Sequence, residues 1–392
     1  MTRFAAPRTL HATLVRAATQ YPVVTLTGPR QSGKTTLCRM AFPEHAYVSL
    51  EPLDTREFAA QDPRGFLAQF AGGVILDEAQ RAPALFSYLQ ETVDRDPRKG
   101  RFIVSGSENL TLAGAVSQSL AGRTAMLVLL PFSLEERAVL PSRPNLLDEA
   151  LFTGGYPRPL VEGIPHERWL QDYFTTYVQR DVRQLARIGD LDTFSRFVRA
   201  CAGRTAQELN LSQLGGDVGV SHNTARAWLG VLEASYLVFR IPAWHRNIKK
   251  QIIKQPKLHF CDTGLACALL GIRHHEQLAT HPLRGAIFES FVASELRKWH
   301  LHRGHPADLH HYRESRGSEV DLLIPGHPRG QLIECKSGQT MQAEFLRHLE
   351  SFSDEQWEKR LVYGGEQPQT RGGVKIVPWS AMADAGCFGA SS

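Results

Sequence analysis

The stretch Gly28-Pro-Arg-Gln-Ser-Gly33-Lys34-Thr35 directly follows the apolar run from Pro22 to Thr27. Glycines at the end of a strand let the backbone curl so that successive N–H groups point at a phosphate. Lys34 supplies positive charge for the β- and γ-phosphates, and the Thr35 hydroxyl can hold magnesium. The sequence therefore predicts a nucleotide-binding protein whose fold is built around this strand and loop.

A second apolar run, Gly73 to Leu76, ends in the adjacent acids Asp77 and Glu78. A carboxylate at the end of a buried strand can hold magnesium through water, and its neighbour can polarise an attacking water as general base. We therefore assign metal binding to Asp77 and catalysis to Glu78. The alternative is a buried strand capped by two solvated acids, but the preceding phosphate-binding loop favours the catalytic interpretation.

A third apolar run, Gly100 to Ser107, ends in hydroxyl side chains that could contact the γ-phosphate. We expect ATP and Mg²⁺ as nucleotide and metal, with Thr35 and Asp77 as metal ligands. The predicted nucleotide-binding residues are Gly28, Pro29, Arg30, Gln31, Ser32, Gly33, Lys34, Thr35, Thr36, Asp77 and Ser107.

A helix of small residues, Leu112 to Ala121, is expected next, and Arg123 separates it from a strand over Ala125 to Leu130. This order of loop, acidic strand, polar strand end and arginine resembles the AAA+ ATPases. The resemblance implies a homo-oligomeric ring, such as a hexamer, in which Arg123 acts as a catalytic finger in the neighbouring subunit's site. Alternatively, Arg123 is a surface residue that caps helix carbonyls.

The composition is that of an intracellular protein with several domains. A chain of 392 residues is long enough for two or three cores. No window approaches the roughly twenty apolar residues of a membrane span, and the first residues contain no apolar signal core. The six cysteines are scattered without a Cys-x-x-Cys pair, which argues against a disulfide framework or a zinc ribbon. We expect a cytoplasmic protein with no membrane partner.

From Leu151 to Gly203 the apolar residues recur at helical spacing, which predicts a helical lid over the nucleotide. The aromatic residues of this stretch, such as Trp169 and Tyr173, are interpreted as core and given no chemistry. The chain then changes to a pattern of short helices, a turn and two strands, up to Asp262.

This next segment has a helix-turn-helix pattern. Short helical stretches at 206–209 and 211–214 precede the turn, and Ser221 caps a helix that starts at His222. Strands at 236–241 and 257–260 are expected to form a wing. The basic run between them suits DNA phosphates, unless it is a solvated loop beside a winged helix that only packs against its neighbours. The predicted DNA contacts are Arg226, Arg246, Lys249, Lys250 and Lys254, with Lys257 at the end of the run.

The C-terminal part contains a second set of chemical residues. Glu289 lies on a predicted helix, Asp321 on a strand, and Glu334 and Lys336 on one face of the next strand. This order resembles the PD-(D/E)xK nuclease superfamily. The resemblance implies magnesium binding by Glu289, Asp321 and Glu334, and a catalytic Lys336 that orients water or stabilises charge. The alternative is a decayed nuclease fold that serves as a binding or assembly module.

Taken together, the chain resembles a bacterial and archaeal family in which an AAA+ ATPase module precedes a winged helix and a nuclease-like domain. The implied fold is α/β: a P-loop AAA+ core at 1–148, a helical lid at 149–204, a winged helix-turn-helix at 205–270 and a restriction-endonuclease-like domain at 271–392. We expect an ATP-hydrolysing protein that acts on DNA, with nuclease activity left open. One alternative is a nucleotide-controlled switch, for instance in a toxin–antitoxin or defence system, whose C-terminal domain binds a partner without cutting. Another is a DNA-binding regulator that uses ATP only for oligomerisation.

Overall fold

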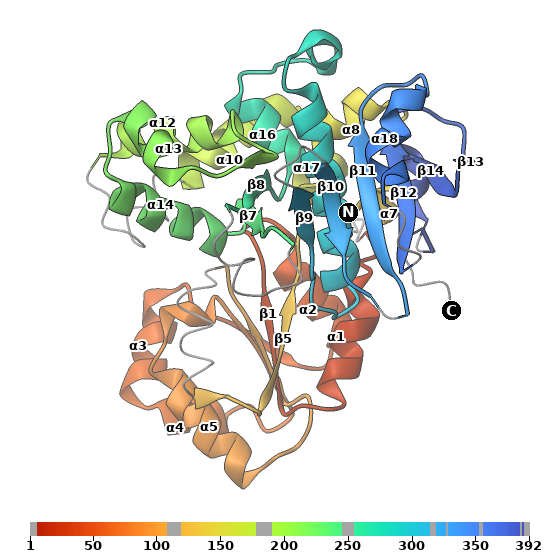
Figure 1. Ribbon diagram of the computed structural model, residues 1–392. Helices are drawn as coiled ribbons and strands as arrows, with labels where there is room; N and C mark the ends of the chain where they lie inside the picture. Colours follow the sequence, from red (N-terminus) through yellow and green to blue (C-terminus); the bar gives the residue numbers. More distant parts are fainter. Residues whose placement is uncertain are drawn as a thin grey trace. The chain divides into compact units, whose positions relative to one another are not determined.

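The computed structural model describes residues 6–107, 119–177, 190–244, 255–313, 319–326, 328–352, 356–384 and 386–387. The chain divides into two compact units (Figure 1). The first consists of Met1–Phe132, Ala234–Tyr236 and His300–Pro306, and the second of Ser133–Glu233, Leu237–Trp299 and Ala307–Ser392.

The first unit is built on a parallel sheet of five strands in the order β2-β3-β4-β1-β5. The strands are β1 (Val23–Thr27), β2 (Ala46–Ser49), β3 (Val74–Asp77), β4 (Phe102–Ser105) and β5 (Thr124–Val128). The three inner strands β1, β3 and β4 are buried along their whole length, because helices cover both faces of a parallel sheet. The predicted α/β fold is confirmed, and the structure shows that its sheet is parallel.

Alternate residues of these strands pack into two different hydrophobic clusters, each with its own helices. Val24 and Ile103 pack with α1 and α2, whereas Val23 and Val104 pack with α4 and α5. The helices of this unit are α1 (Leu10–Ala18), α2 (Lys34–Ala41), α3 (Leu53–Gln61), α4 (Pro63–Ala68), η1 (Ala79–Arg81) and α5 (Leu85–Arg95). The predicted helix at Leu112–Ala121 lies mostly outside the described residues.

The second unit begins with helices, as the spacing of its apolar residues predicts. They are α7 (Leu134–Arg137), α8 (Leu147–Thr153), α9 (Pro157–Glu162), α10 (His166–Tyr177) and α12 (Leu191–Ala202). Trp169 and Tyr173 stack with their ring centroids 5.2 Å apart, and the Tyr156 hydroxyl donates to that of Tyr173 at 3.1 Å. All three rings belong to one buried cluster, so the interpretation of Trp169 and Tyr173 as core is confirmed.

Two helices joined by a turn follow, α13 (Leu211–Val218) and α14 (His222–Ala234). Ser221 caps the start of α14 as predicted, because its hydroxyl accepts the Thr224 N–H at 3.1 Å. A three-stranded antiparallel sheet, β6-β8-β7, comes from β6 (Gln207–Glu208), β7 (Val238–Ile241) and β8 (Lys257–Phe260). The predicted short helix at 206–209 is wrong, since its central residues pair with β8 instead.

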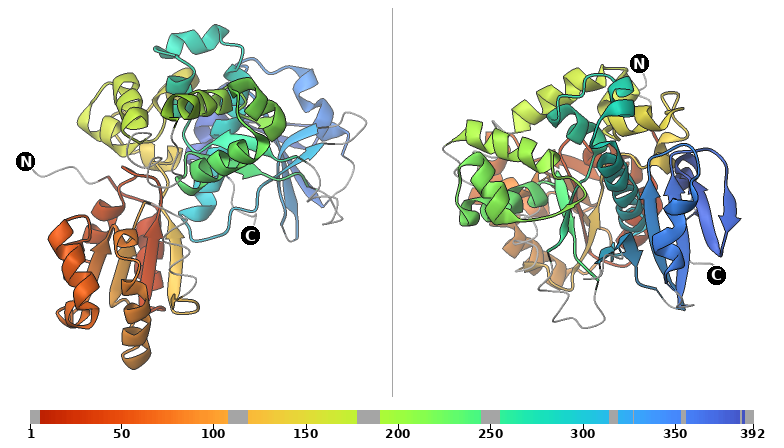
Figure 2. Two further views of the ribbon diagram at one scale, coloured as in Figure 1. Left: turned by 90° about the vertical axis from the view of Figure 1, so that its left-hand side faces the viewer. Right: turned by 45° about the horizontal axis from the view of Figure 1, so that its top comes forward.

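The last part of the second unit is a six-stranded mixed sheet in the order β13-β14-β12-β11-β10-β9. Phe288 and Val292 of the long helix α17 pack in one cluster with Leu322 and Ile333 of the sheet (Figures 1 and 2). The elements are α16 (Thr263–Leu269), η3 (His275–Thr280), α17 (Arg284–Leu301), β9 (His310–Arg313), β10 (Glu319–Ile324), β11 (Gly330–Lys336), η4 (Ala343–Leu346), α18 (Arg347–Glu350), β12 (Trp357–Tyr363), β13 (Gln369–Arg371), β14 (Val374–Pro378) and η5 (Trp379–Ala383).

All six cysteines are free thiols, in agreement with the predicted absence of a disulfide framework. Within the described ranges, none of the helices combines the length and the apolar character that crossing a membrane requires.

Candidate functional sites

The loop between β1 and α2 has a backbone that requires glycine. Gly28 and Gly33 have φ angles of 147° and 94°, which strain any residue with a side chain. A Cβ atom on Gly28 would lie 2.1 Å from the carbonyl oxygen of Leu129. Gln31, between the two glycines, also has a positive φ of 62°. The loop is therefore curled in the manner predicted for phosphate binding.

Lys34 is the first residue of α2 and is only 6% exposed. Its ammonium donates hydrogen bonds of 2.9 Å and 2.8 Å to the carbonyl oxygens of Gly28 and Pro29. Burial lowers the pKa of Lys34 to about 8, although the Glu78 and Asp77 carboxylates oppose this shift. A buried cation is stabilised by negative partners, so the loop holds a charge suited to a phosphate group.

Asp77, at the carboxyl end of β3, accepts hydrogen bonds from three other elements. Its Oδ2 accepts from the hydroxyls of Thr35 at 2.8 Å and Tyr47 at 2.9 Å, and its Oδ1 accepts from the Ser105 hydroxyl at 2.6 Å. Burial, followed by the charge of Asp77, raises the pKa of Tyr47 to about 12, so this phenol remains a donor. Neither Tyr47 nor its strand was among the sequence predictions.

Glu78 has φ 54° and ψ 42°, a left-handed conformation that costs a non-glycine residue about 1–3 kcal/mol. Its Oε2 accepts hydrogen bonds from the Gln80 amide at 2.5 Å and the Ser107 hydroxyl at 3.3 Å. Ser107, predicted to contact the nucleotide, here holds Glu78. The predicted catalytic carboxylate is thus fixed in orientation directly after the predicted metal ligand.

Arg8 contacts the phosphate-binding loop, and it was not among the predicted site residues. Its guanidinium donates to the carbonyl oxygens of Ser32 and Leu130, both at 2.6 Å, and lies 4.7 Å from the ring centroid of Phe132. An arginine ahead of the first strand carries no motif, so only the folded chain shows this contact.

The loop residues fit a magnesium-bound triphosphate. The Ser32 hydroxyl is buried and has no hydrogen-bond partner among the described residues. The Thr35 hydroxyl and the Asp77 carboxylate are oxygen donors of the kind that Mg²⁺ prefers. Of the other predicted contacts, Arg30 is half-buried and Thr36 is exposed on α2.

Arg123 forms a two-pronged ion pair with Asp94 of α5. Its Nε and Nη2 donate to the two Asp94 oxygens at 2.6 Å and 2.9 Å, and its Nη1 donates to the Ala121 carbonyl at 3.2 Å. The hydrogen bonds to Arg123 lower the pKa of Asp94. The Ala121 contact matches the alternative of an arginine that binds backbone carbonyls, and the role of a finger stays a prediction.

Two of the residues predicted for the nuclease-like site, Glu289 and Asp321, lie in the second unit around Lys257 of β8. Its ammonium lies 2.9 Å from Glu289 Oε1, 2.9 Å from Glu319 Oε1 and 3.7 Å from Asp321 Oδ1. Burial and the charge of Asp321 raise the pKa of Glu289 well above its ordinary value. Burial alone would lower the pKa of Lys257, but the surrounding carboxylates raise it.

Glu334 and Lys336 lie on the same side of β11 as predicted and pair at 2.6 Å. Asp321 Oδ2 accepts the backbone N–H of Cys335 at 2.8 Å. Burial and Asp321 together raise the pKa of Glu334 to about 7. The described parts of the chain contain no group of three or more His, Cys, Asp or Glu side chains arranged to hold a metal ion.

The predicted DNA contacts are placed in only two cases. Arg226 is exposed on α14, whereas Arg246, Lys249, Lys250 and Lys254 lie outside the described residues. The interpretation of Lys257 as a DNA contact is wrong. It is 3% exposed and bound to carboxylates, because the run that looked continuous in sequence ends inside a buried strand.

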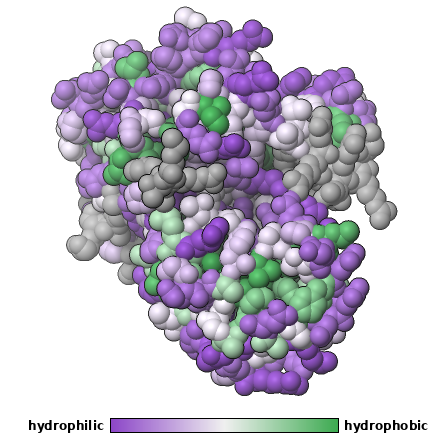
Figure 3. Space-filling model, turned by 180° about the vertical axis from the view of Figure 1, so that it is seen from behind, coloured by the Kyte–Doolittle hydropathy of each residue, from purple (hydrophilic) through white to green (hydrophobic). Residues whose placement is uncertain are grey.

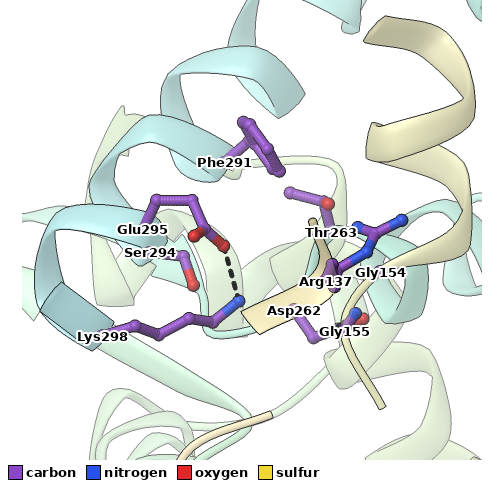
Figure 4. Close-up of a pocket in the computed structure, with 9 residues that line it drawn as sticks. All are labelled: Arg137, Gly154, Gly155, Asp262, Thr263, Phe291, Ser294, Glu295 and Lys298. Atoms are coloured by element: carbon purple, nitrogen blue, oxygen red, sulfur yellow. Dashed lines mark hydrogen bonds and ion pairs between the residues drawn. The ribbon is translucent and has the colours of Figure 1, made fainter. Parts of the chain in front are cut away.

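A small cavity in the second unit is lined by charged residues but leaves little room (Figure 4). Lys298 pairs with Glu295 at 2.8 Å, and Asp262 Oδ2 accepts the Gly155 N–H at 2.7 Å. The volume of the cavity is about 10 Å³, which is enough for one water molecule. We therefore assign it no ligand.

Comparisons with known proteins match three parts of the sequence. Residues 20–138 match the family described as "AAA domain". Residues 144–276 match "Domain of unknown function (DUF8612)", and residues 284–382 match "Domain of unknown function (DUF4143)". The first match shows that the chain contains an AAA-type ATPase domain, and the second and third give no activity.

Two relatives match most of the chain: "Uncharacterized protein Rv2008c" of Mycobacterium tuberculosis and "Uncharacterized protein Mb2031c" of Mycobacterium bovis. Each is 33% identical over 333 residues, which cover 83% of this chain and 73% of the relative. The chain belongs to the family of these two proteins. Since both are uncharacterised, membership of the family adds no function to that of the AAA domain.

Solved structures show more distant likeness. The Walker-type ATPase PABY2304 of Pyrococcus abyssi is 18% identical, with a TM-score of 0.46 over 66% of this chain and 94% of that one. RuvB of Thermotoga maritima is 16% identical, with a TM-score of 0.30 over 62% of this chain and 92% of that one. At these TM-scores neither structure adds to the assignment.

Proposed function

We propose that the AAA domain binds and hydrolyses ATP at the loop before α2. Lys34 binds the β- and γ-phosphates, Thr35 and Asp77 hold Mg²⁺, and Glu78 is the general base. The observation that carries this proposal is the group of hydrogen bonds at Asp77, which brings the phosphate-binding loop beside the acidic strand.

The chemistry of each residue follows from its contacts. The Lys34 ammonium, bonded to loop carbonyls, exchanges them for phosphate oxygens of opposite charge. Bound Mg²⁺ neutralises phosphate charge. Glu78 orients a water and accepts its proton, because Gln80 and Ser107 hold its carboxylate in one direction.

We propose that the chain works as a homo-oligomer, which requires exposed contact surface on the AAA domain. Leu53 and Phe58 of α3 are 62% and 39% exposed, and Figure 3 shows apolar areas on an otherwise mainly hydrophilic face. For Arg123 to act in a neighbouring site, it would first have to leave Asp94.

A second proposed function is action on DNA, favoured by the two capped helices α13 and α14 and the strands β7 and β8. This order of elements is that of a winged helix. Arg226 is exposed on the second helix, where a DNA-reading helix presents its side chains. The alternative remains a winged helix that only packs within the protein.

We do not propose metal-dependent cleavage, because the predicted metal ligands are bonded to lysines and to backbone within the second unit. The proposal is therefore an ATPase that binds DNA or a protein partner through its second unit. ATP turnover with and without linear, forked and four-way DNA tests it, followed by gel analysis of the same DNA. DNA-stimulated turnover supports action on DNA, whereas slow turnover unaffected by DNA favours the nucleotide-controlled switch. Absence of ATP turnover under all conditions contradicts the ATPase assignment.

A further inference from the structure

Lys257 is a buried cation surrounded by carboxylates. Its side chain is 4% exposed, and its ammonium lies within 4 Å of Glu289, Glu319 and Asp321, which come from α17 and β10 (Figure 1). The side chains of Glu289 and Asp321 are themselves only 13% exposed. A buried group of negative charges needs a cation, and here the chain supplies one.

Two of these carboxylates are also two of the three predicted metal ligands. Asp321 uses its second oxygen for the Cys335 N–H at 2.8 Å, and the third predicted ligand, Glu334, pairs with Lys336 at 2.6 Å. Every predicted ligand thus has a partner from the protein. Glu334 Oε2 is buried without a hydrogen-bond partner among the described residues, but one oxygen does not make a metal site. A divalent ion at about 2.0–2.6 Å would also need oxygens that already bind a lysine or a backbone N–H, and it would be repelled by two nearby ammonium groups. The residues therefore do not fit a resident metal.

We propose that the Lys257 ammonium takes the place of the metal ion in this nuclease-like domain. The acidic cluster is then a permanent internal ion-pair network and not a centre for metal-dependent phosphodiester cleavage.

The same contacts indicate a structural role for the cluster. Lys257 belongs to the segment matched at residues 144–276, and its three carboxylates belong to the segment matched at 284–382. The ion pairs therefore connect β8 of the three-stranded sheet to α17 and to β10 of the C-terminal sheet. Removing one buried partner leaves the others uncompensated, so Lys257 is expected to hold these two parts of the second unit together.

Replacing Lys257 by methionine tests the proposal, since this keeps most of the side-chain volume and removes the charge. Mn²⁺ is titrated against the full chain without nucleotide, and free Mn²⁺ is followed by electron paramagnetic resonance. We expect Lys257→Met to gain one Mn²⁺ site, at least about tenfold tighter than any in the wild type, and the added change Asp321→Asn to abolish it. Lys375→Met is the matched control, because Lys375 is a 55% exposed lysine on β14 of the sheet that carries Asp321, and its loss should create no site.

Asp77→Asn identifies any Mn²⁺ bound at the nucleotide site, so a failure of the ATPase proposal stays distinguishable from a failure here. If Lys257→Met does not fold, Mn²⁺ titrations of the wild type and Asp321→Asn are compared instead. Identical titration curves support the proposal that Lys257 is the internal cation. A wild-type Mn²⁺ site that Asp321→Asn abolishes overturns the proposal. A folded Lys257→Met protein without a new site overturns it as well.

Discussion

Thr35 donates a hydrogen bond of 2.8 Å to Asp77 across 42 positions of sequence. Thr35 lies in the first turn of α2, and Asp77 is the last residue of β3. Both groups are typical magnesium ligands of P-loop proteins. Their contact shows that the two halves of the proposed nucleotide site are assembled in this unit.

Thr35→Val should weaken binding of MgATP by roughly tenfold, because one oxygen ligand and about 1.4 kcal/mol are lost. Binding of ATP in the presence of a chelator should stay unchanged, since the valine keeps the shape of the threonine. Fluorescence titration with a labelled nucleotide measures both. Thr19→Val is the control, as this hydroxyl donates to the Arg16 carbonyl at the end of α1 and lies outside both the loop and the acidic strand. Equal loss with and without magnesium would remove Thr35 from the metal site.

The affinity for ATP should depend on pH through Lys34. Its pKa is lowered to about 8 in the free protein, so above this pH the lysine is neutral and must take up a proton to bind phosphate. The binding constant should bend downward around pH 8 and approach a fall of about tenfold per pH unit well above it. Lys34→Arg, which stays charged, should lose this dependence. The same fall in the arginine variant would assign it to another group.

Arg123→Ala should retain ATP binding and lose turnover, and mixing it with Lys34→Ala chains should restore some activity, because a finger acts on the neighbour's site. Asp94→Ala provides the contrast. It removes the ion-pair partner of Arg123 and leaves the finger in place, so its turnover should persist. Equal turnover in the wild type and Arg123→Ala would identify the arginine as a surface residue.

Charge reversal at Lys249, Lys250 and Lys254 should weaken DNA binding and flatten its salt dependence, with basal ATP turnover unchanged. Each duplex phosphate contact removed lowers the slope of log K against log salt by roughly 0.9. Arg168→Glu is the control, because Arg168 is a 77% exposed arginine of α10. An unchanged slope would assign the basic run to a solvated loop.

The parts of the site that could be predicted are those whose conformation depends on residues adjacent in the sequence. A glycine-rich loop and an apolar run that ends in acids carry their structure in a few adjacent residues, and both lie where expected. Tyr47 and Arg8 could not be predicted, since their contacts with Asp77 and with the loop carbonyls depend on strand order and helix packing.

Lys257 is a residue for which the charge pattern of the sequence leads to a wrong prediction. In the sequence it closes a run of basic residues without an acid, a pattern that predicts contact with DNA. In the folded chain it lies on a fully buried strand, and its partners are 32 or more residues away in sequence. A run of charged residues therefore predicts an exposed surface only for residues that do not belong to a buried strand.

Single-turnover and steady-state hydrolysis of ATP by the wild type, Lys34→Ala and Glu78→Gln test the central claim most directly. We expect Lys34→Ala to bind no nucleotide, because the phosphate charge loses its partner. Glu78→Gln should bind ATP like the wild type and hydrolyse it at least about a hundredfold more slowly, because the general base is lost. Hydrolysis by Glu78→Gln at the wild-type rate would contradict the account.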